Sequence, residues 1–152
     1  MWLLGRWIEE EKEDTLCDEF NVGPGDIYRH VESAEWLLYA AGSIAELYHY
    51  KKLSFNLEGL RHRVRYGIKQ ELLELATLRG VGRIRARQLF AHGYHKLGDL
   101  KSTSESSLAS IKTIGKSLAY DILEQIRNPL RKRSFTPIIV EEPLQETVQW
   151  SD

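Results

Sequence analysis

The chain has 152 residues, of which 42% are hydrophobic and 28% charged, and its formal net charge is -1. This composition supplies a hydrophobic core and excludes a wholly disordered chain, and no apolar run approaches the ~20 residues of a membrane-spanning helix. Cys17 is the only cysteine, which excludes an internal disulfide, and no signal-peptide pattern opens the sequence, so we expect a cytoplasmic protein.

The first third of the chain predicts helices. Residues 2–22 are typical of two short helices, the second over Glu13–Phe20, and a turn is expected at residues 21–25. Asp26 stands where a helix N-cap belongs, and one long amphipathic helix follows, because apolar residues recur at steps of three and four. This apolar set is Ile27, Val31, Ala34, Leu38, Ala41, Ala45 and Tyr48. Residues 51–68 are expected to form a basic connector.

An arginine and a tryptophan lie off the apolar stripe of the long helix. At 100° per residue, Arg29 and Trp36 lie together on the opposite side. A large ring in that position can stack on an unpaired base while the arginine holds a phosphate. The alternative is that Trp36 packs against another domain or the connector.

Residues 69–127 predict a second unit with shorter helices and an internal repeat. Residues 75–90 and 108–123 superimpose at an offset of 33, with apolar, glycine and alanine positions in the same order. Each copy resembles the helix-hairpin-helix pattern, and the pair resembles the tandem form found in many DNA repair and replication proteins. Val81 and Ile114 are expected to plug the turns into the core, and Ala86 and Ala119 to allow close helix crossing.

The two predicted turns are candidate phosphate sites. Glycine lets the backbone approach an anion, and the following helix N-terminus adds partial positive charge. The candidate residues are Arg79, Gly80, Val81 and Gly82 in the first turn, and Thr113, Gly115 and Lys116 in the second. Thr113 replaces the first glycine of the pattern, so either it caps or contacts a phosphate, or the second copy is only a packing partner.

Charge is segregated along the chain. Residues 51–133 carry 18 Lys+Arg against 7 Asp+Glu, whereas residues 1–50 carry 3 against 11 and residues 134–152 carry none against 4. A basic middle between acidic ends favours binding of a polyanion, although lysine and arginine also serve as a solvated coat.

Three arginines follow the first turn. Of these, only Arg83 and Arg87 can share a helix face, whereas Arg85 points elsewhere. Three arginines at a helix start oppose the helix dipole, which predicts an anionic partner, either nucleic acid or a carboxylate surface. The alternative places them in water or against the chain's own acids.

Four stretches in collinear order resemble the C-terminal part of the archaeal Hjm-type DNA repair helicases of superfamily 2. They are residues 23–26, 32–38, 63–67 and 78–87. The full enzyme of that family has two ATPase domains, a winged helix, a helical ratchet domain and a C-terminal helix-hairpin-helix domain, and it unwinds branched replication intermediates 3′ to 5′ along single-stranded DNA. The resemblance implies that Arg29 and Trp36 contact the translocating strand.

The same resemblance implies that Arg83, Arg85 and Arg87 grip single-stranded DNA and restrain the motor. We therefore expect a ratchet-like region over residues 1–60 and a tandem helix-hairpin-helix domain over 61–130. The tail over 131–152, first basic and then acidic with Pro137 and Pro143, is expected to be flexible. The predicted fold is all-α, a helical bundle fragment with one long helix followed by the compact tandem domain.

No catalytic residue is expected in this chain, which lacks the phosphate-loop and Asp-Glu-x-His motifs of an ATPase. ATP and Mg are therefore expected only in motor domains outside it. His92 and His95 flank a Gly-Tyr pair without further ligands, so no metal site is expected.

Two functions remain open from the sequence. The first is a DNA-binding, motor-regulating helicase region that binds single-stranded and forked DNA in the nucleoid, without a membrane. The second is a protein-interaction module that docks a single-strand-binding protein or a sliding clamp, with the acidic tail as its docking peptide. Within the tail, residues 136–140 are expected to be at best an edge strand, because of Pro137.

Overall fold

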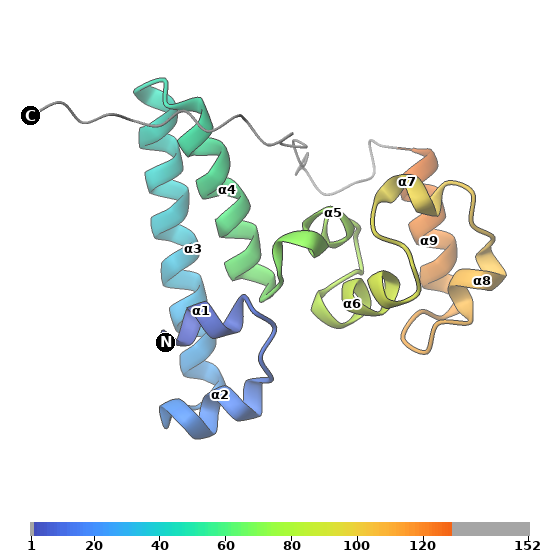
Figure 1. The fold of residues 1–152 in the computed structure, drawn as a ribbon, viewed down its shortest axis with the longest axis horizontal. Helices are drawn as coiled ribbons and strands as arrows, with labels where there is room; N and C mark the ends of the chain where they lie inside the picture. Colours follow the sequence, from blue (N-terminus) through green and yellow to red (C-terminus); the bar gives the residue numbers. More distant parts are fainter. Residues whose placement is uncertain (1, 129–152) are drawn as a thin grey trace, which may run out of the picture.

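The computed structural model describes residues 2–128, which form nine α-helices, one short 3-10 helix and no strand (Figure 1). The all-α prediction is confirmed for this part of the chain. None of its helices is long and apolar enough to cross a membrane. The predicted tail, with the strand at residues 136–140, lies outside the described residues.

The long predicted helix is present as α3 (Pro24–Leu47), preceded by α1 (Leu3–Trp7) and α2 (Glu13–Phe20). Its start differs from the prediction, because Gly23 is the N-cap and Pro24 opens the helix. Proline is favoured there, since the first helical N–H has no intrahelical acceptor. Asp26 lies one turn in and accepts the Gly23 N–H at 2.9 Å. The assignment of Asp26 as the N-cap was therefore wrong, although its carboxylate does cap the helix.

The predicted basic connector was also wrong, because residues 51–66 form helix α4 (Lys51–Tyr66). α4 runs antiparallel to α3 and packs along it (Figure 1). Two of its arginines face α3: Glu35 lies 3.6 Å from Arg61 and 3.0 Å from Arg65, and Arg61 lies over the Tyr39 ring. Two of the three arginines in the predicted connector thus form ion pairs between α3 and α4, and Arg63 instead pairs with Glu9 at 3.3 Å.

A first core lies among α1, α2, α3 and α4. Its buried members are Trp7, Leu16, Ile27, Val31 and Val64. Most of the predicted α3 stripe faces this core or α4, with Ala45 also buried and Ala34, Leu38 and Ala41 half-buried. Tyr48 does not, because it follows the last helical residue and is 67% exposed.

A second core lies among the remaining elements. These are a 3-10 turn (Gln70–Leu72), α5 (Leu73–Ala76), α6 (Arg83–Ala91), α7 (Leu97–Leu100), α8 (Glu105–Ala109) and α9 (Lys116–Arg127). Its buried side chains are leucine, isoleucine, valine and alanine throughout. Ala86 and Ala119 are fully buried, as their expected place at close helix crossings requires.

Gly67 joins the two cores. Val64 belongs to the first core and Ile68 to the second, so the predicted boundary after residue 60 falls inside α4. Gly67 ends α4 with a φ of +59°, and a Cβ at this position would lie 2.6 Å from Trp7 Cε2. A glycine is required here both by the left-handed backbone and by the indole packed against it.

Candidate nucleic-acid interface

The two predicted hairpin turns have the same backbone design. The first joins α5 to α6 and the second joins α8 to α9. In each, the apolar residue donates its N–H to the carbonyl three residues earlier, Val81 to Leu78 at 3.2 Å and Ile114 to Ile111 at 2.8 Å. Both apolar side chains are fully buried, which confirms that they plug the turns into the core.

Each turn then opens a new helix behind an extended glycine. Gly82 is the N-cap of α6 and Gly115 that of α9. The first N–H groups of such a helix have no intrahelical acceptor and are available to an anion. The basic and glycine positions at the turn surface are exposed, namely Arg79, Gly80, Lys112, Gly115 and Lys116, whereas Gly82 is half-buried.

A buried glutamine fixes the first turn. Gln125 on α9 is 4% exposed; its Oε1 accepts the Arg79 N–H at 2.7 Å and its Nε2 donates to the Arg79 carbonyl at 3.2 Å. This contact joins the second hairpin to the first. This contact was not predicted from the sequence, although one signal was available: Gln125 interrupts the buried, otherwise apolar face of α9 beside Ile122 and Ile126.

The first turn position differs between the copies. Gly80 has a φ of +80°, and a Cβ there would meet Leu118 Cδ1 at 2.8 Å. Thr113 stands at the equivalent position without a positive φ. Its Oγ1 is buried and makes no hydrogen bond within residues 2–128. The hydroxyl therefore faces the interior, and only the backbone of Thr113 is left to meet a phosphate.

Thr113→Val should leave the chain as stable as before or raise its free energy of unfolding by up to about 1 kcal/mol, because it removes a buried hydroxyl without a partner. Urea denaturation measures the change. Thr77→Val is the matched control, since the Thr77 hydroxyl is buried and donates to the Glu74 carbonyl at 2.7 Å. Equal destabilisation by both variants would contradict the assignment.

Arg85 ties the two turns together. Its Nη1 donates to the Gly80 carbonyl at 2.7 Å and its Nε to the Thr113 carbonyl at 3.1 Å. One guanidinium thus binds the equivalent carbonyl in each hairpin. Arg85 remains exposed, but these contacts fix the spacing of the turns.

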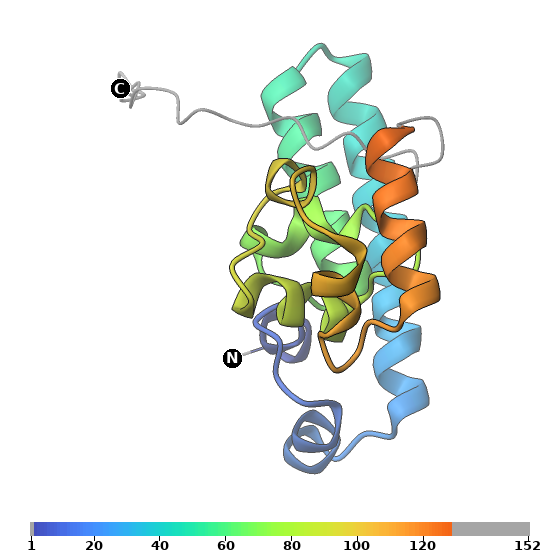
Figure 2. The same ribbon diagram turned by 90° about the vertical axis from the view of Figure 1, so that its right-hand side faces the viewer.

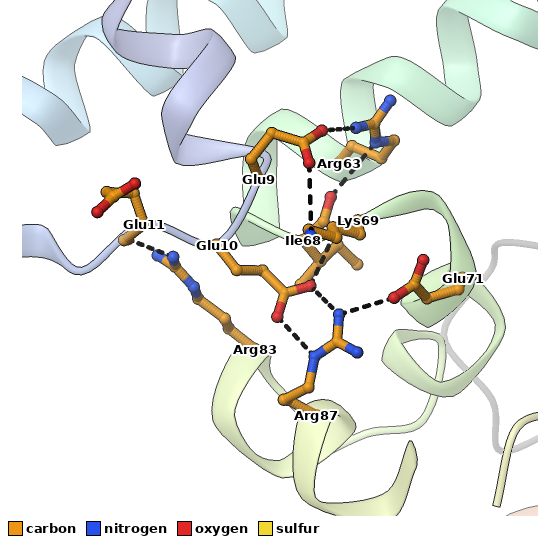
Figure 3. A network of polar contacts seen from close by, with 9 residues as sticks. All are labelled: Glu9, Glu10, Glu11, Arg63, Ile68, Lys69, Glu71, Arg83 and Arg87. Atoms are coloured by element: carbon orange, nitrogen blue, oxygen red, sulfur yellow. Dashed lines mark hydrogen bonds and ion pairs between the residues drawn. The ribbon is translucent and has the colours of Figure 1, made fainter. Parts of the chain in front are cut away.

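Arg83 and Arg87 share a face, as predicted, and this face meets the chain's own acidic segment between α1 and α2 (Figure 3). Arg87 binds both carboxylate oxygens of Glu10, Nε at 2.7 Å and Nη2 at 2.5 Å, and it also contacts Glu71 at 3.0 Å. Arg83 donates to the Glu11 carbonyl and lies 4.9 Å from the centroid of the Trp7 ring. Arg87 thus pairs with the chain's own acids, one of the predicted alternatives, whereas Arg83 binds a backbone carbonyl.

The surroundings shift the pKa values of these arginines in opposite directions. Burial lowers the pKa of Arg83. The hydrogen bonds that Arg87 donates to Glu10, followed by the one it donates to Glu71, raise the pKa of Arg87. Both remain cations at neutral pH, because a free guanidinium titrates far above it.

The predicted strand-contacting pair on α3 is accessible. Trp36 is 67% exposed, and Arg29 is exposed and forms an ion pair with Asp26. Seven residues of helix separate the two by about 10 Å. Figure 1 places α3 and the α8–α9 hairpin at opposite ends of the molecule, and Figure 2 shows the hairpin helices in front of α3 and α4. The candidate residues therefore form two separate groups.

Residues 2–128 contain no group of three His, Cys, Asp or Glu side chains that could hold a metal ion. His92 and His95 make other contacts. The His92 Nδ1 lies 2.7 Å from the Gln88 carbonyl oxygen, and the His95 ring packs 4.4 Å from that of Phe90.

Two family models match the two halves of the chain. Residues 1–67 match the family model of the archaeal helicase, domain 4, and residues 72–128 match the SAM-like helix-hairpin-helix tandem. The ATP-dependent DNA helicase Hel308 of Pyrococcus horikoshii is 37% identical over 97% of this chain. The chain belongs to the archaeal Hel308 helicase family. The resemblance found in the sequence is thereby confirmed.

Further Hel308 relatives show the same correspondence. Hel308 of Pyrobaculum calidifontis is 41% identical over 84% of the chain, and that of Caldivirga maquilingensis is 44% identical over 80%. The chain spans 20%, 18% and 16% of these three relatives in turn, about a fifth of their length. It corresponds to one region of a Hel308 helicase.

Proposed function

We propose that this chain binds single-stranded and forked DNA and regulates the motor of an ATP-dependent helicase that moves 3′ to 5′ on branched DNA. One observation carries the proposal: two turns of the same design each present exposed basic residues beside a helix N-terminus. Such turns recognise the sugar-phosphate backbone, so binding is largely independent of base sequence.

The phosphate contacts are assigned to the turn surfaces. In the first turn Arg79 and the backbone of Gly80 and Gly82 face a phosphate, and in the second Lys112 and Lys116 do so. Val81 and Thr113 contribute through their backbone only, because the Val81 side chain and the Thr113 hydroxyl are buried.

The α3 pair supplies the single-strand contact. Trp36 stacks on an unpaired base and Arg29 holds a phosphate about two turns along the helix. In support of this role, both side chains are exposed on the face of α3 opposite its buried stripe.

ATP and Mg²⁺ are assigned to motor domains outside this chain, because no residue here forms a nucleotide-binding loop. The partners of this region are then DNA and the motor domains. Its role in the cycle is to hold the strand while ATP turnover occurs elsewhere.

Single-strand affinity should fall steeply with salt, because bound phosphates release counterions. With four neutralised phosphates, affinity drops roughly 50-fold between about 50 and about 200 mM salt. Fluorescence anisotropy with labelled single-stranded, duplex and forked DNA measures this drop. Lys112→Gln combined with Lys116→Gln should weaken binding and flatten the salt dependence.

The matched control for this pair is Lys51→Gln combined with Lys52→Gln, which removes two exposed lysines from the start of α4. If both pairs of substitutions change the affinity equally, the hairpin turns are not the phosphate sites.

A second candidate function is docking of a single-strand-binding protein or a sliding clamp. It is favoured by the large apolar side chains exposed around the connection between α3 and α4, which are Ile44, Leu47, Tyr48, Tyr50 and Leu53. The proposed tail contact lies outside the described residues. Capture of either protein by a chain with no measurable DNA affinity at low salt would favour this function over the first.

A further inference from the structure

Three consecutive glutamates, Glu9–Glu11, lie in the segment between α1 and α2, and the last two contact arginines of α6 (Figure 3). The central residue, Glu10, has a φ of +67°, one of the few positive values at a non-glycine residue among residues 2–128. A side chain in this left-handed region is disfavoured, so the surrounding contacts must hold it there. Two backbone hydrogen bonds at the end of α1 supply part of that hold, from the Glu10 N–H to the Trp7 carbonyl at 3.1 Å and from the Glu11 N–H to the Arg6 carbonyl at 3.2 Å. The Glu10 carboxylate makes the remaining contacts.

The Glu10 carboxylate accepts hydrogen bonds as a phosphate would. The guanidinium of Arg87 binds both of its oxygens, and the backbone N–H of Lys69 donates to Oε1 at 3.1 Å. Guanidinium forks bind carboxylates and phosphates in the same two-point geometry. The Glu10 side chain is only 13% exposed, so the contact is shielded from water.

The second arginine of this face acts on the same carboxylate. The positive charge of Arg83 helps to lower the pKa of Glu10. Burial alone would raise that pKa, but hydrogen bonds from Arg87 and the Lys69 amide, together with both arginine charges, lower it overall. Glu10 is therefore an anion at neutral pH.

We infer that the Glu10 carboxylate occupies the phosphate position of the Arg83–Arg87 face, so that a DNA phosphate binds these arginines only after the α1–α2 segment has moved away. This inference rests on the proposed function, because it needs DNA as the competing anion. It makes Glu10 a positioning residue that sets DNA affinity from outside the hairpins. Binding at α6 is then coupled to release of the N-terminal helices.

The test compares two glutamines in the same segment of the full 152-residue chain. Glu10→Gln removes the competing charge and should tighten single-strand binding about fivefold or more, the usual lower range of coupling between two sites. Glu9→Gln removes the same charge from the preceding residue, but Glu9 contacts Arg63 and Lys69 rather than α6. It should change the affinity by less than about twofold on the same scale.

A second variant guards against misfolding. Glu10→Gly removes the carboxylate while matching the left-handed backbone, so it should fold and show the same gain in affinity. Arg87→Ala completes a double-mutant cycle: it should weaken DNA binding more in the Glu10→Gln background than in the wild type, because Arg87 is then free to meet phosphate.

The outcomes separate this inference from the proposed function. Unchanged affinity in Glu10→Gln and Glu10→Gly, with a wild type that binds DNA, overturns the inference and leaves the proposed function intact. Equal losses from Arg87→Ala in both backgrounds overturn it as well. A higher single-strand affinity in the Glu10 variants but not in Glu9→Gln supports the inference. A wild type and variants that all fail to bind DNA would overturn both the inference and the proposed function.

Discussion

Trp7→Ala should lower the free energy of unfolding by about 3–5 kcal/mol, the usual cost of removing a buried indole. Trp7 is 5% exposed, and its Nε1–H donates to the Val64 carbonyl at 2.7 Å. That carbonyl belongs to the last turn of α4, where carbonyls lack intrahelical partners. The substitution thus leaves both a cavity beside Gly67 and an unpaired acceptor.

Because domains are stable by only about 5–15 kcal/mol, this loss is large enough to follow by chemical denaturation and circular dichroism. Trp2→Ala is the matched control, since Trp2 is 88% exposed and should change stability by less than about 0.5 kcal/mol. Trp7→Phe, which keeps most of the buried area but loses the hydrogen bond, should lie between them. Equal midpoints for the two alanine variants would refute the role given to Trp7.

Trp36→Ala should weaken single-strand binding by about 1–3 kcal/mol, or roughly 5- to 150-fold, because one base loses its stacking partner. The fold should be unaffected, since the ring is 67% exposed on α3. Fluorescence anisotropy with labelled single-stranded DNA measures the affinity. Binding to blunt duplex should change little, since its bases are already stacked on each other.

Leu37→Ala is a suitable control for Trp36→Ala, because Leu37 is the next residue and is 59% exposed, but it projects from a different face of α3. If Trp36→Ala binds single-stranded DNA as tightly as the wild type does, Trp36 does not stack on the bound strand. A loss of equal size in Leu37→Ala would point to a general effect on the surface of α3.

The features predicted correctly from the sequence were those that depend on residues close together in the chain. The apolar period from Ile27 marked α3, and the repeat marked both hairpins, because Val81 and Ile114 recur in the same glycine and alanine frame. The exposure of Trp36 followed from its angle on the helix wheel. Each of these signals lies within one helix or within one pair of helices joined by a short turn.

The features that sequence reasoning missed depend on residues far apart in the chain. The residues of α4 were predicted to form a basic connector because Arg61 and Arg65 form ion pairs with Glu35 on another helix, α3. A local sequence pattern does not show such a tertiary contact. The partner of Arg87 is 77 residues away at Glu10, and no local pattern could distinguish it from the other acids near the N-terminus. The three-arginine motif predicted an anion but could not indicate which one.

The hydrogen bond from the Lys69 amide to Glu10 joins residues 59 apart, and the Glu10–Arg87 pair joins residues 77 apart. Contacts that close such long loops are reached late on a folding pathway, since the entropy of loop closure opposes them until the intervening chain is ordered. We therefore expect the first ten residues to dock last and to undock first. The order of assembly is thus set by chain connectivity: the second core and the α3–α4 pair form first, and the first ten residues then complete the first core and join it to the second.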